Sequence, residues 1–468
     1  MKRTLLIFAI FVLAQPVMPA QQGAVATAPA PAAAVDEIFS KWTTSTPGCA
    51  VGVAVGGKPV LMKAYGMADL EHDVRNTPDT IFEAGSVSKQ FTAMAVQLLV
   101  SEGKLKLDDP VRKYIPELPE YEWPVTIRHM LSHTSGLRDW GSVESIAGWP
   151  RTTREYTHAH VLEIVSRQKS LNFQPGTKWS YSNTGFNLAA IIVSRVSGMP
   201  FAEFSKQRIF GPLGLKHTSW RDDHTRVVKG RATAYSLQDG EYHIEMPFEN
   251  VHGNGGLLTT VGDLLTWNEN LVIPKVGNAR LIAEMTEVGH FNDGKPLAYG
   301  LGFFVEEHRG VHNIYHSGST AGYRAHLNRF PLTNTSIAVL CNGSNGDASR
   351  SANRVSDIYL AGRVKLLPDT RESRIVDGFA SNHMVSPIGD FPGEYWSHEA
   401  ETTLVAVIDK GFLTLRRRPD TVIKLDEVGP DTFRGSIGTV TFRRNAKGVV
   451  EALSINQDRV WDLRFTKK

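Results

Sequence analysis

Strand-like segments stand at both ends of residues 36–366, with helical segments between them, and this order limits the folds open to the chain. Apolar runs at 47–65 predict a β-hairpin around "GGKP", and further strands follow within 299–343. Apolar residues at three- and four-residue steps predict helices at 89–102, 126–137, 157–168, 183–198 and 259–272. We therefore expect an α+β fold, in which one antiparallel sheet made from both ends of the segment is flanked by helices and carries an inserted all-helical block.

The sequence changes character after residue 366. Residues 367–388 are irregular and contain two prolines, with a third close behind at Pro392, which is typical of a linker. Beyond them, short alternating runs such as "TTLVAVID" and "TVTFRRN" are separated by turns at even intervals. This spacing predicts a barrel or sandwich at 389–468, and we favour a small C-terminal antiparallel β-barrel.

The N-terminal residues have the composition of export signals. Residues 1–20 combine cationic residues, a short apolar run and small residues before Ala20, which is typical of a secretory signal peptide. Residues 21–35 form an Ala/Pro-rich tether. The apolar run is short for a bilayer, so we expect an exported protein, periplasmic or secreted, without stable membrane insertion. The net charge is only +3, and the lysines and arginines are not clustered into a basic stripe. Both observations argue against a nucleic-acid partner.

Cys49 and Cys341 are the two cysteines of the chain, and each lies in a strand-like run. Because one pair of cysteines makes no disulfide framework, we favour buried free thiols over a single bridge. We still expect the two side chains to lie close together. The first and last strands of the sheet should pair antiparallel, which brings the start of one to the end of the other.

The segment "AGSVSKQFTAMAVQLLV" places a serine and a lysine where an apolar helix begins. Helical spacing starts at Lys89, so Ser86 lies on the first turn, near free backbone N–H groups. Lys89 is one turn further on along the same face, within hydrogen-bond reach of Ser86. An isolated S-x-x-K is more often a serine N-cap beside a solvated lysine, so the pair needs partners elsewhere in the chain.

Two further motifs supply those partners. "YSN" places Tyr181 and Asn183 before an apolar helix, and "HSG" places His316, Ser317 and Gly318 on a strand. In order and spacing, S-x-x-K, Y-x-N and H-x-G together resemble the serine beta-lactamase and penicillin-binding-protein superfamily. The resemblance is to the class C-like branch, which includes D-Ala-D-Ala carboxypeptidases, D-aminopeptidases and esterases. Segments such as "IRHMLSHTSGL" and "HSGSTAGYRAHLNRFP" extend it over about residues 36–365.

The resemblance implies a serine hydrolase that works through an acyl-enzyme on Ser86, with no cofactor and no metal. A serine hydroxyl needs a base within hydrogen-bond reach, and Lys89 and Tyr181 would flank it. Nearby cations favour a phenolate, so Lys89 and a protonated His316 would lower the pKa of Tyr181. Asn183 would orient Lys89 and the substrate amide.

Substrate binding would use the strand that carries H-S-G. The backbone N–H groups of Ser86 and Ser319 would hold the oxyanion of the tetrahedral intermediate. Ser317 would donate a hydrogen bond to the substrate, and the missing side chain at Gly318 would let the substrate backbone lie against the strand.

The H-S-G motif is a departure, because beta-lactamases of this branch usually carry K-T-G there. Histidine titrates near neutral pH, whereas lysine is a permanent cation. We therefore expect a peptidase acting on D-amino-acid-containing peptides, or an esterase. The alternatives are a class C-like beta-lactamase and a non-catalytic peptidoglycan- or penicillin-binding protein on the same fold. The sequence specifies neither the physiological acyl donor among peptides, esters and beta-lactams nor the oligomeric state, and the barrel is either a docking module or a wall of the active site.

Two histidine pairs suggest metal ligands but lack the further ligands that a metal site needs. His129 and His133 are four residues apart, on one predicted helical face, and His158 and His160 form H-x-H at a helix start. We expect both pairs to be parts of helices.

Overall fold

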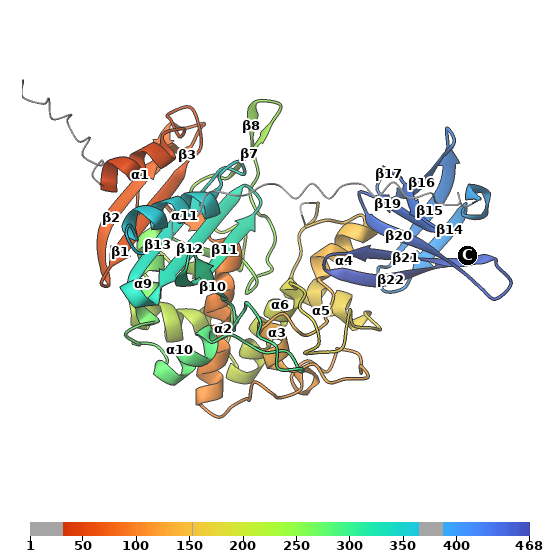
Figure 1. Cartoon of the computed structure of the whole chain (residues 1–468), viewed down its shortest axis with the longest axis horizontal. Helices are drawn as coiled ribbons and strands as arrows, with labels where there is room; N and C mark the ends of the chain where they lie inside the picture. Colours follow the sequence, from red (N-terminus) through yellow and green to blue (C-terminus); the bar gives the residue numbers. More distant parts are fainter. Residues whose placement is uncertain (1–30, 152, 365–386) are drawn as a thin grey trace, which may run out of the picture.

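The computed structural model describes residues 31–151, 153–364 and 387–468 (Figure 1). The expected signal peptide, most of the tether and nearly all of the linker lie outside the described residues. A six-stranded antiparallel sheet, in the order β10-β11-β12-β13-β1-β2, organises the larger part of the chain. Its strands are β1 (Cys49–Val55), β2 (Lys58–Tyr65), β10 (Phe304–His308), β11 (Val311–Thr320), β12 (Tyr323–Phe330) and β13 (Thr335–Cys341).

The first strand of this sheet pairs with its last strand, as expected. β1 and β13 run antiparallel in a register that places Cys49 opposite Cys341. The expected proximity of the two cysteines is confirmed, but the preference for free thiols is wrong, because a disulfide joins them. Directly opposed residues on neighbouring strands bring their Cβ atoms within the reach of a disulfide. Two separate strand patterns do not reveal that register.

Helices cover both faces of the sheet. On one face, α1 (Pro31–Phe39) and α11 (Ala348–Tyr359) lie together (Figure 1) and bury an apolar cluster with the strands. α1 begins before the expected domain start at residue 36, because Val35 already belongs to that cluster. On the other face, α9 (Val261–Asn270) packs on β1 and β13.

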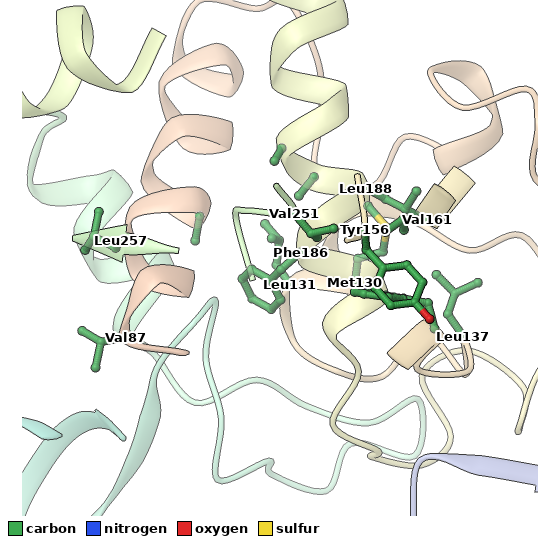
Figure 2. Close-up of a cluster of buried hydrophobic side chains, with 14 of the residues drawn as sticks. Val87, Met130, Leu131, Leu137, Tyr156, Val161, Phe186, Leu188, Val251 and Leu257 are labelled. Atoms are coloured by element: carbon green, nitrogen blue, oxygen red, sulfur yellow. The ribbon is translucent and has the colours of Figure 1, made fainter. Parts of the chain in front are cut away.

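The helical block lies between the two groups of strands in the sequence, as the pattern predicts. Figure 2 shows its apolar core, in which Leu131 and Phe186 lie together while Val87 lies apart from them, at the start of α2. α6 packs against both α2 and α3, and the starts of α2 and α6 carry the polar motifs. The helices are α2 (Ser88–Ser101), α3 (Ile127–Leu131), α4 (Trp140–Ala147), α5 (His158–Ser166), α6 (Asn183–Ser197), α7 (Phe201–Ser205), α8 (Gly211–Leu213) and α10 (Ala279–Thr286).

Short strands join these layers. They are β3 (Met67–Asp69), β4 (Val74–Arg75), β5 (Phe82–Glu83), β6 (Ser219–Trp220), β7 (Tyr235–Gln238), β8 (Glu241–Ile244) and β9 (Leu257–Thr259). β5 matters most for the site, because it ends directly before the turn that carries Ser86. Glu83 of β5 is buried in an ion pair with Arg221, which holds β5 in place.

The C-terminal residues form a nearly closed antiparallel barrel-like sheet of nine strands, which confirms the expected fold class. Its core is packed with aromatic rings, including Phe391, Phe433 and Phe442. The strands are β14 (Gly393–Ser397), β15 (Thr402–Asp409), β16 (Phe412–Arg417), β17 (Thr421–Lys424), β18 (Asp426–Gly429), β19 (Thr432–Gly435), β20 (Gly438–Arg444), β21 (Val450–Gln457) and β22 (Val460–Lys467).

The barrel packs against the helical block beside α4 (Figure 1). Arg138, whose side chain is 1% exposed, pairs with Glu399 of the barrel. The same guanidinium donates to the carbonyl oxygens of Trp461 and Asp462. A buried guanidinium is costly unless acceptors surround it, and the barrel supplies acceptors for Arg138. This contact therefore joins the barrel to the helical block.

None of the single helices in the described residues is long and apolar enough to cross a membrane. The bent pair formed by Asn183–Ser197 and Phe201–Leu213 passes that test by length and composition alone.

Candidate active site

Ser86 and Lys89 meet where α2 begins. Ser86 lies in a short 3₁₀ turn, Gly85–Val87, that leads into α2, and its side chain caps neither helix. Lys89 is fully buried, and its Nζ lies 3.0 Å from Ser86 Oγ. The simple N-cap interpretation of S-x-x-K therefore does not hold for this segment.

The surroundings of Lys89 favour its neutral amine. Burial lowers the pKa of Lys89 well below its ordinary value, and the nearby Arg459 guanidinium lowers it further, while Asp139 acts the other way. The Nζ atom also contacts Asn183 Oδ1 at 3.0 Å and the Asn254 carbonyl oxygen at 2.7 Å. A neutral amine has two N–H groups for these two acceptors and a lone pair left for the Ser86 hydroxyl.

Asn183 and Asn254 are themselves held in place. Asn183 begins α6, and its backbone N–H donates to Asp139 Oδ2 at 2.7 Å. Asn187 lies one turn further along α6 and donates to Asn254 Oδ1 at 2.7 Å. The acceptors around Lys89 are thus fixed by a second set of buried hydrogen bonds.

Tyr181 lies over the same lysine. The Lys89 Nζ atom is 4.7 Å from the centroid of the Tyr181 ring, and the His133 ring packs on the ring with centroids 4.2 Å apart. Burial raises the pKa of Tyr181 above its ordinary value, although contact with Ser86 and the charge of Arg459 act in the opposite direction. The expected lowering of this pKa is therefore wrong, because desolvation of a phenolate outweighs the nearby cations.

His316 does not supply the expected positive charge. It is 1% exposed, and burial, followed by repulsion from the protonated form of Lys89, lowers its pKa to about 3. Its Nδ1 lies 2.6 Å from the Ser317 carbonyl oxygen, so Nδ1 carries the proton, and Nε2 accepts from the Tyr299 hydroxyl at 3.0 Å. The sequence pattern predicted the position of this residue but not how deeply it is buried.

Gly318 is required by the approach of β11 to the serine turn. A Cβ atom at Gly318 would lie 2.0 Å from the Ala84 carbonyl oxygen and 3.1 Å from the Ser86 nitrogen. A Cβ atom at Gly85 would lie 2.7 Å from the Ser319 nitrogen. The backbone nitrogens of Ser86 and Ser319 therefore lie where the serine turn and β11 approach each other closely.

These residues line one open cavity of about 750 Å³. Ser317 and Ser319 lie on its wall with Ser86 and Tyr181. The barrel contributes the turn between β21 and β22, which makes it a wall of this cavity. The structure thus brings together every predicted site residue: Ser86, Lys89, Tyr181, Asn183, His316, Ser317, Gly318 and Ser319.

Several residues of the site were missed by the sequence analysis. His133 was assigned to a helical face with His129, but it lies beyond the end of α3 with φ of 59° and accepts from the Ser182 N–H. Asp139, Asn254 and Tyr299 were not singled out at all. For His133, the signal was the "SHTSG" stretch, where the apolar spacing of the helix ends.

The histidine pairs do not form metal sites in the described structure. His129 and His160 each complete a capping box at the start of their helices, and His158 bonds the His252 carbonyl oxygen. The group of potential ligands that the described residues bring together is Asp69, Glu71 and His72, on an exposed turn.

Comparison with known protein families gives one match that covers most of the chain. The family model described as "Beta-lactamase" matches residues 32–361. This chain therefore belongs to the beta-lactamase family.

Two curated relatives and one solved structure illustrate the similarity. Penicillin-binding protein 4* of Bacillus subtilis is 30% identical over 59% of this chain and 64% of its own length. A D-aminopeptidase of Gluconobacter oxydans is 28% identical over 63% of this chain and 56% of its own length, so the chain spans less than two thirds of these relatives. The octameric penicillin-binding protein homologue from Pyrococcus abyssi has the same fold, with a TM-score of 0.64 and 24% identity over 93% of this chain and 99% of that one.

Proposed function

We propose that this chain is a serine hydrolase that forms an acyl-enzyme on Ser86 and acts as a peptidase or amidase on substrates containing D-amino acids. The observation that carries the proposal is the buried Lys89 amine, which lies 3.0 Å from the Ser86 hydroxyl and is held by two carbonyl acceptors. A serine placed for structure alone needs no desolvated base beside it.

Acylation follows from the protonation states. Neutral Lys89 accepts the Ser86 proton as Oγ bonds to the substrate carbonyl carbon, and the amides of Ser86 and Ser319 hold the resulting oxyanion. The Tyr181 phenol, which keeps its proton because burial raises its pKa, donates to the departing amine as the carbon–nitrogen bond breaks. Lys89 returns the proton to Tyr181, which leaves an ester on Ser86 and both side chains as they began.

Deacylation repeats these steps with water. A water molecule gives its proton to Lys89 as its oxygen attacks the acyl carbon, and Ser86 leaves with a proton from the same side chains. The products are the free acid and the regenerated serine. His316 takes no part in these transfers and instead supports β11 through Tyr299.

The D-amino-acid preference is supported by the D-aminopeptidase relatives. The uncharged His316 separates this site from one with a lysine at the same position, which supports a peptidase or amidase over a beta-lactamase. An esterase activity on the same serine follows from the same chemistry, since esters have the better leaving group.

We also propose that the protein is exported to the periplasm or beyond the cell. The disulfide between Cys49 and Cys341 supports this, because such bonds persist in oxidising compartments. Expression of the full chain followed by cell fractionation and N-terminal sequencing would test the proposal. Retention in the cytoplasm with an intact N-terminus would contradict it.

The decisive experiment tests the nucleophile and the substrate class together. Intact-mass analysis after treatment with a fluorophosphonate should show an adduct on the wild-type protein that is absent from Ser86→Ala. Ser101→Ala, at the other end of α2, serves as the matched control. Hydrolysis of D- and L-amino-acid p-nitroanilides, D-Ala-D-Ala peptides, p-nitrophenyl esters and nitrocefin then ranks the substrates. An adduct that persists in Ser86→Ala would reject the assignment, and a preference for nitrocefin would favour the beta-lactamase.

A further inference from the structure

Three arginines line or border the Ser86 cavity, and two of them are occupied by acceptors. Arg151 donates to Glu249, and Arg324 donates to the carbonyl oxygens of Ala321 and Tyr323. The third, Arg459, comes from the turn between β21 and β22 of the barrel. Its guanidinium carbon lies 4.8 Å from the centroid of the Tyr181 ring.

Arg459 is a half-buried cation without an acceptor for its guanidinium within residues 31–151, 153–364 and 387–468. Its effect reaches the reacting groups, since its charge lowers the pKa of Lys89 and favours ionisation of Tyr181. A charge held this close to two proton-transfer groups weakens their ability to hold protons. A site that keeps such a charge unpaired is suited to an anion that arrives with the substrate.

The backbone around Arg459 is held on both sides of the side chain. The Asp458 carbonyl oxygen accepts from Ser180 Oγ at 3.1 Å. The Arg459 carbonyl oxygen accepts from the Asp139 N–H at 3.2 Å and from Asn172 Nδ2 at 3.1 Å. Asp139 is the residue whose carboxylate binds the start of α6, so the barrel turn and the Asn183 segment share one anchor.

Trp461, which follows the turn, is also held by contacts with the helical block. The Trp461 N–H donates to Asn172 Oδ1 at 2.8 Å, and its ring packs on Phe173 with centroids 5.1 Å apart. Together with the buried Arg138, these contacts fix the position of the turn relative to Tyr181. Arg459 therefore points into the cavity from a rigid support, which is what selective binding requires.

We propose that Arg459 binds a carboxylate on the leaving-group side of the substrate, so that the barrel gives the enzyme its preference for leaving groups that carry a free carboxylate. This inference rests on the proposed function, because Tyr181 defines the leaving-group side as its proton donor. The planar guanidinium, which lies over the Tyr181 ring, can offer paired N–H groups to a carboxylate. Asp458 is an exposed residue, so water screens its charge from Arg459, and no ion pair joins the two side chains in the described structure.

The test uses the full-length protein and two N-benzoylglycyl thioesters. One has thioglycolic acid as its leaving thiol and the other has thioglycolamide, so the pair differs only in carboxylate against carboxamide. The achiral acyl group keeps the comparison independent of any D or L preference. Thiol release gives kcat/KM for each substrate in the wild type, Arg459→Gln, Arg459→Lys and Arg416→Gln. Arg416 is an exposed arginine on β16, and its variant controls for loss of charge from the same barrel.

The quantity compared is the ratio of kcat/KM for the acid to that for the amide. We expect the wild type to prefer the acid, and Arg459→Gln to lower the ratio roughly ten- to a hundredfold, which is the scale of one charge-assisted hydrogen-bonded pair. Arg459→Lys should keep part of the preference, and Arg416→Gln should keep all of it. The ratio cancels any general effect of a variant on folding or on Lys89.

Fluorophosphonate carries no carboxylate, so labelling tests the Ser86 nucleophile independently of the Arg459 carboxylate site. If the wild type is labelled but does not prefer the acid, or if Arg459→Gln keeps the wild-type ratio, this inference is overturned while the proposed function stands. If the wild type neither reacts with fluorophosphonate nor cleaves either thioester, the proposed function fails, and this inference fails with it.

Discussion

Replacing Lys89 with arginine tests whether a neutral amine drives the reaction. Arginine keeps the positive charge of a protonated lysine but holds its proton throughout the accessible pH range, so it cannot accept one from Ser86. Burial lowers the pKa of Lys89, and Arg459 and Arg151 lower it further against the opposing charge of Asp139. The lysine therefore loses its proton at lower pH than a lysine in water.

The size of the effect follows from the contacts. Lys89 is the group within 3.0 Å of Ser86 Oγ that can take its proton, and a general base is typically worth about 10²–10⁴ in rate. We expect Lys89→Arg and Lys89→Met to lose at least about a hundredfold in kcat/KM. Lys216→Arg, at an exposed position, should behave like the wild type.

The dependence of kcat/KM on pH shows which form of Lys89 is active. At low pH the Lys89 ammonium has no lone pair, so the wild-type kcat/KM should rise with pH as this group deprotonates. It should fall again only in strongly alkaline solution, where Tyr181 loses the proton that its raised pKa retains. Rates of p-nitroanilide hydrolysis across pH measure both limbs, because the departing amine needs the Tyr181 proton, and thermal melting checks folding. A Lys89→Arg variant within a few-fold of wild type would refute the assignment of Lys89 as the base.

Three further predictions follow from the packing. Gly318→Ala should cost on the order of a hundredfold in kcat, since its Cβ would lie 2.0 Å from the Ala84 carbonyl oxygen and displace the oxyanion amides; normal turnover would contradict that geometry. Cys341→Ser should lower the free energy of unfolding by about 2–4 kcal/mol in denaturant titrations, and an unchanged midpoint would show that the bridge with Cys49 adds no stability. The His316 ring should remain neutral down to a pH of about 3 in NMR titrations, and protonation near neutral pH would contradict its burial.

The sequence was most informative where the chemistry is local. The three-residue step from Ser86 to Lys89 places both side chains on one face of a helix turn, and the structure shows their contact. That contact depends on helical periodicity, which a single sequence displays directly. The pairing of β1 with β13 is a long-range contact, and it was predicted from the order of strands and helices along the chain.

Burial and long-range contacts explain what the sequence did not show. His316 was expected to titrate near neutral pH, but its protonation depends on the layers packed over β11, which the strand pattern does not contain. Arg459 was missed because it reaches Tyr181 from a hairpin turn of a separate barrel. Its immediate neighbours, "QDRVW", read as an ordinary polar turn.

The pairing of β1 with β13 also sets the order in which this protein can mature. Cys49 and Cys341, which face each other at one end of that ladder, are separated by 292 positions, so the central sheet closes only after most of the chain has been synthesised. Ser86 is synthesised early, but β11, which carries the Ser319 amide of the proposed oxyanion hole, arrives late. A nascent or truncated chain thus holds its nucleophile without the groups that activate it, and hydrolytic capacity appears only with the completed sheet.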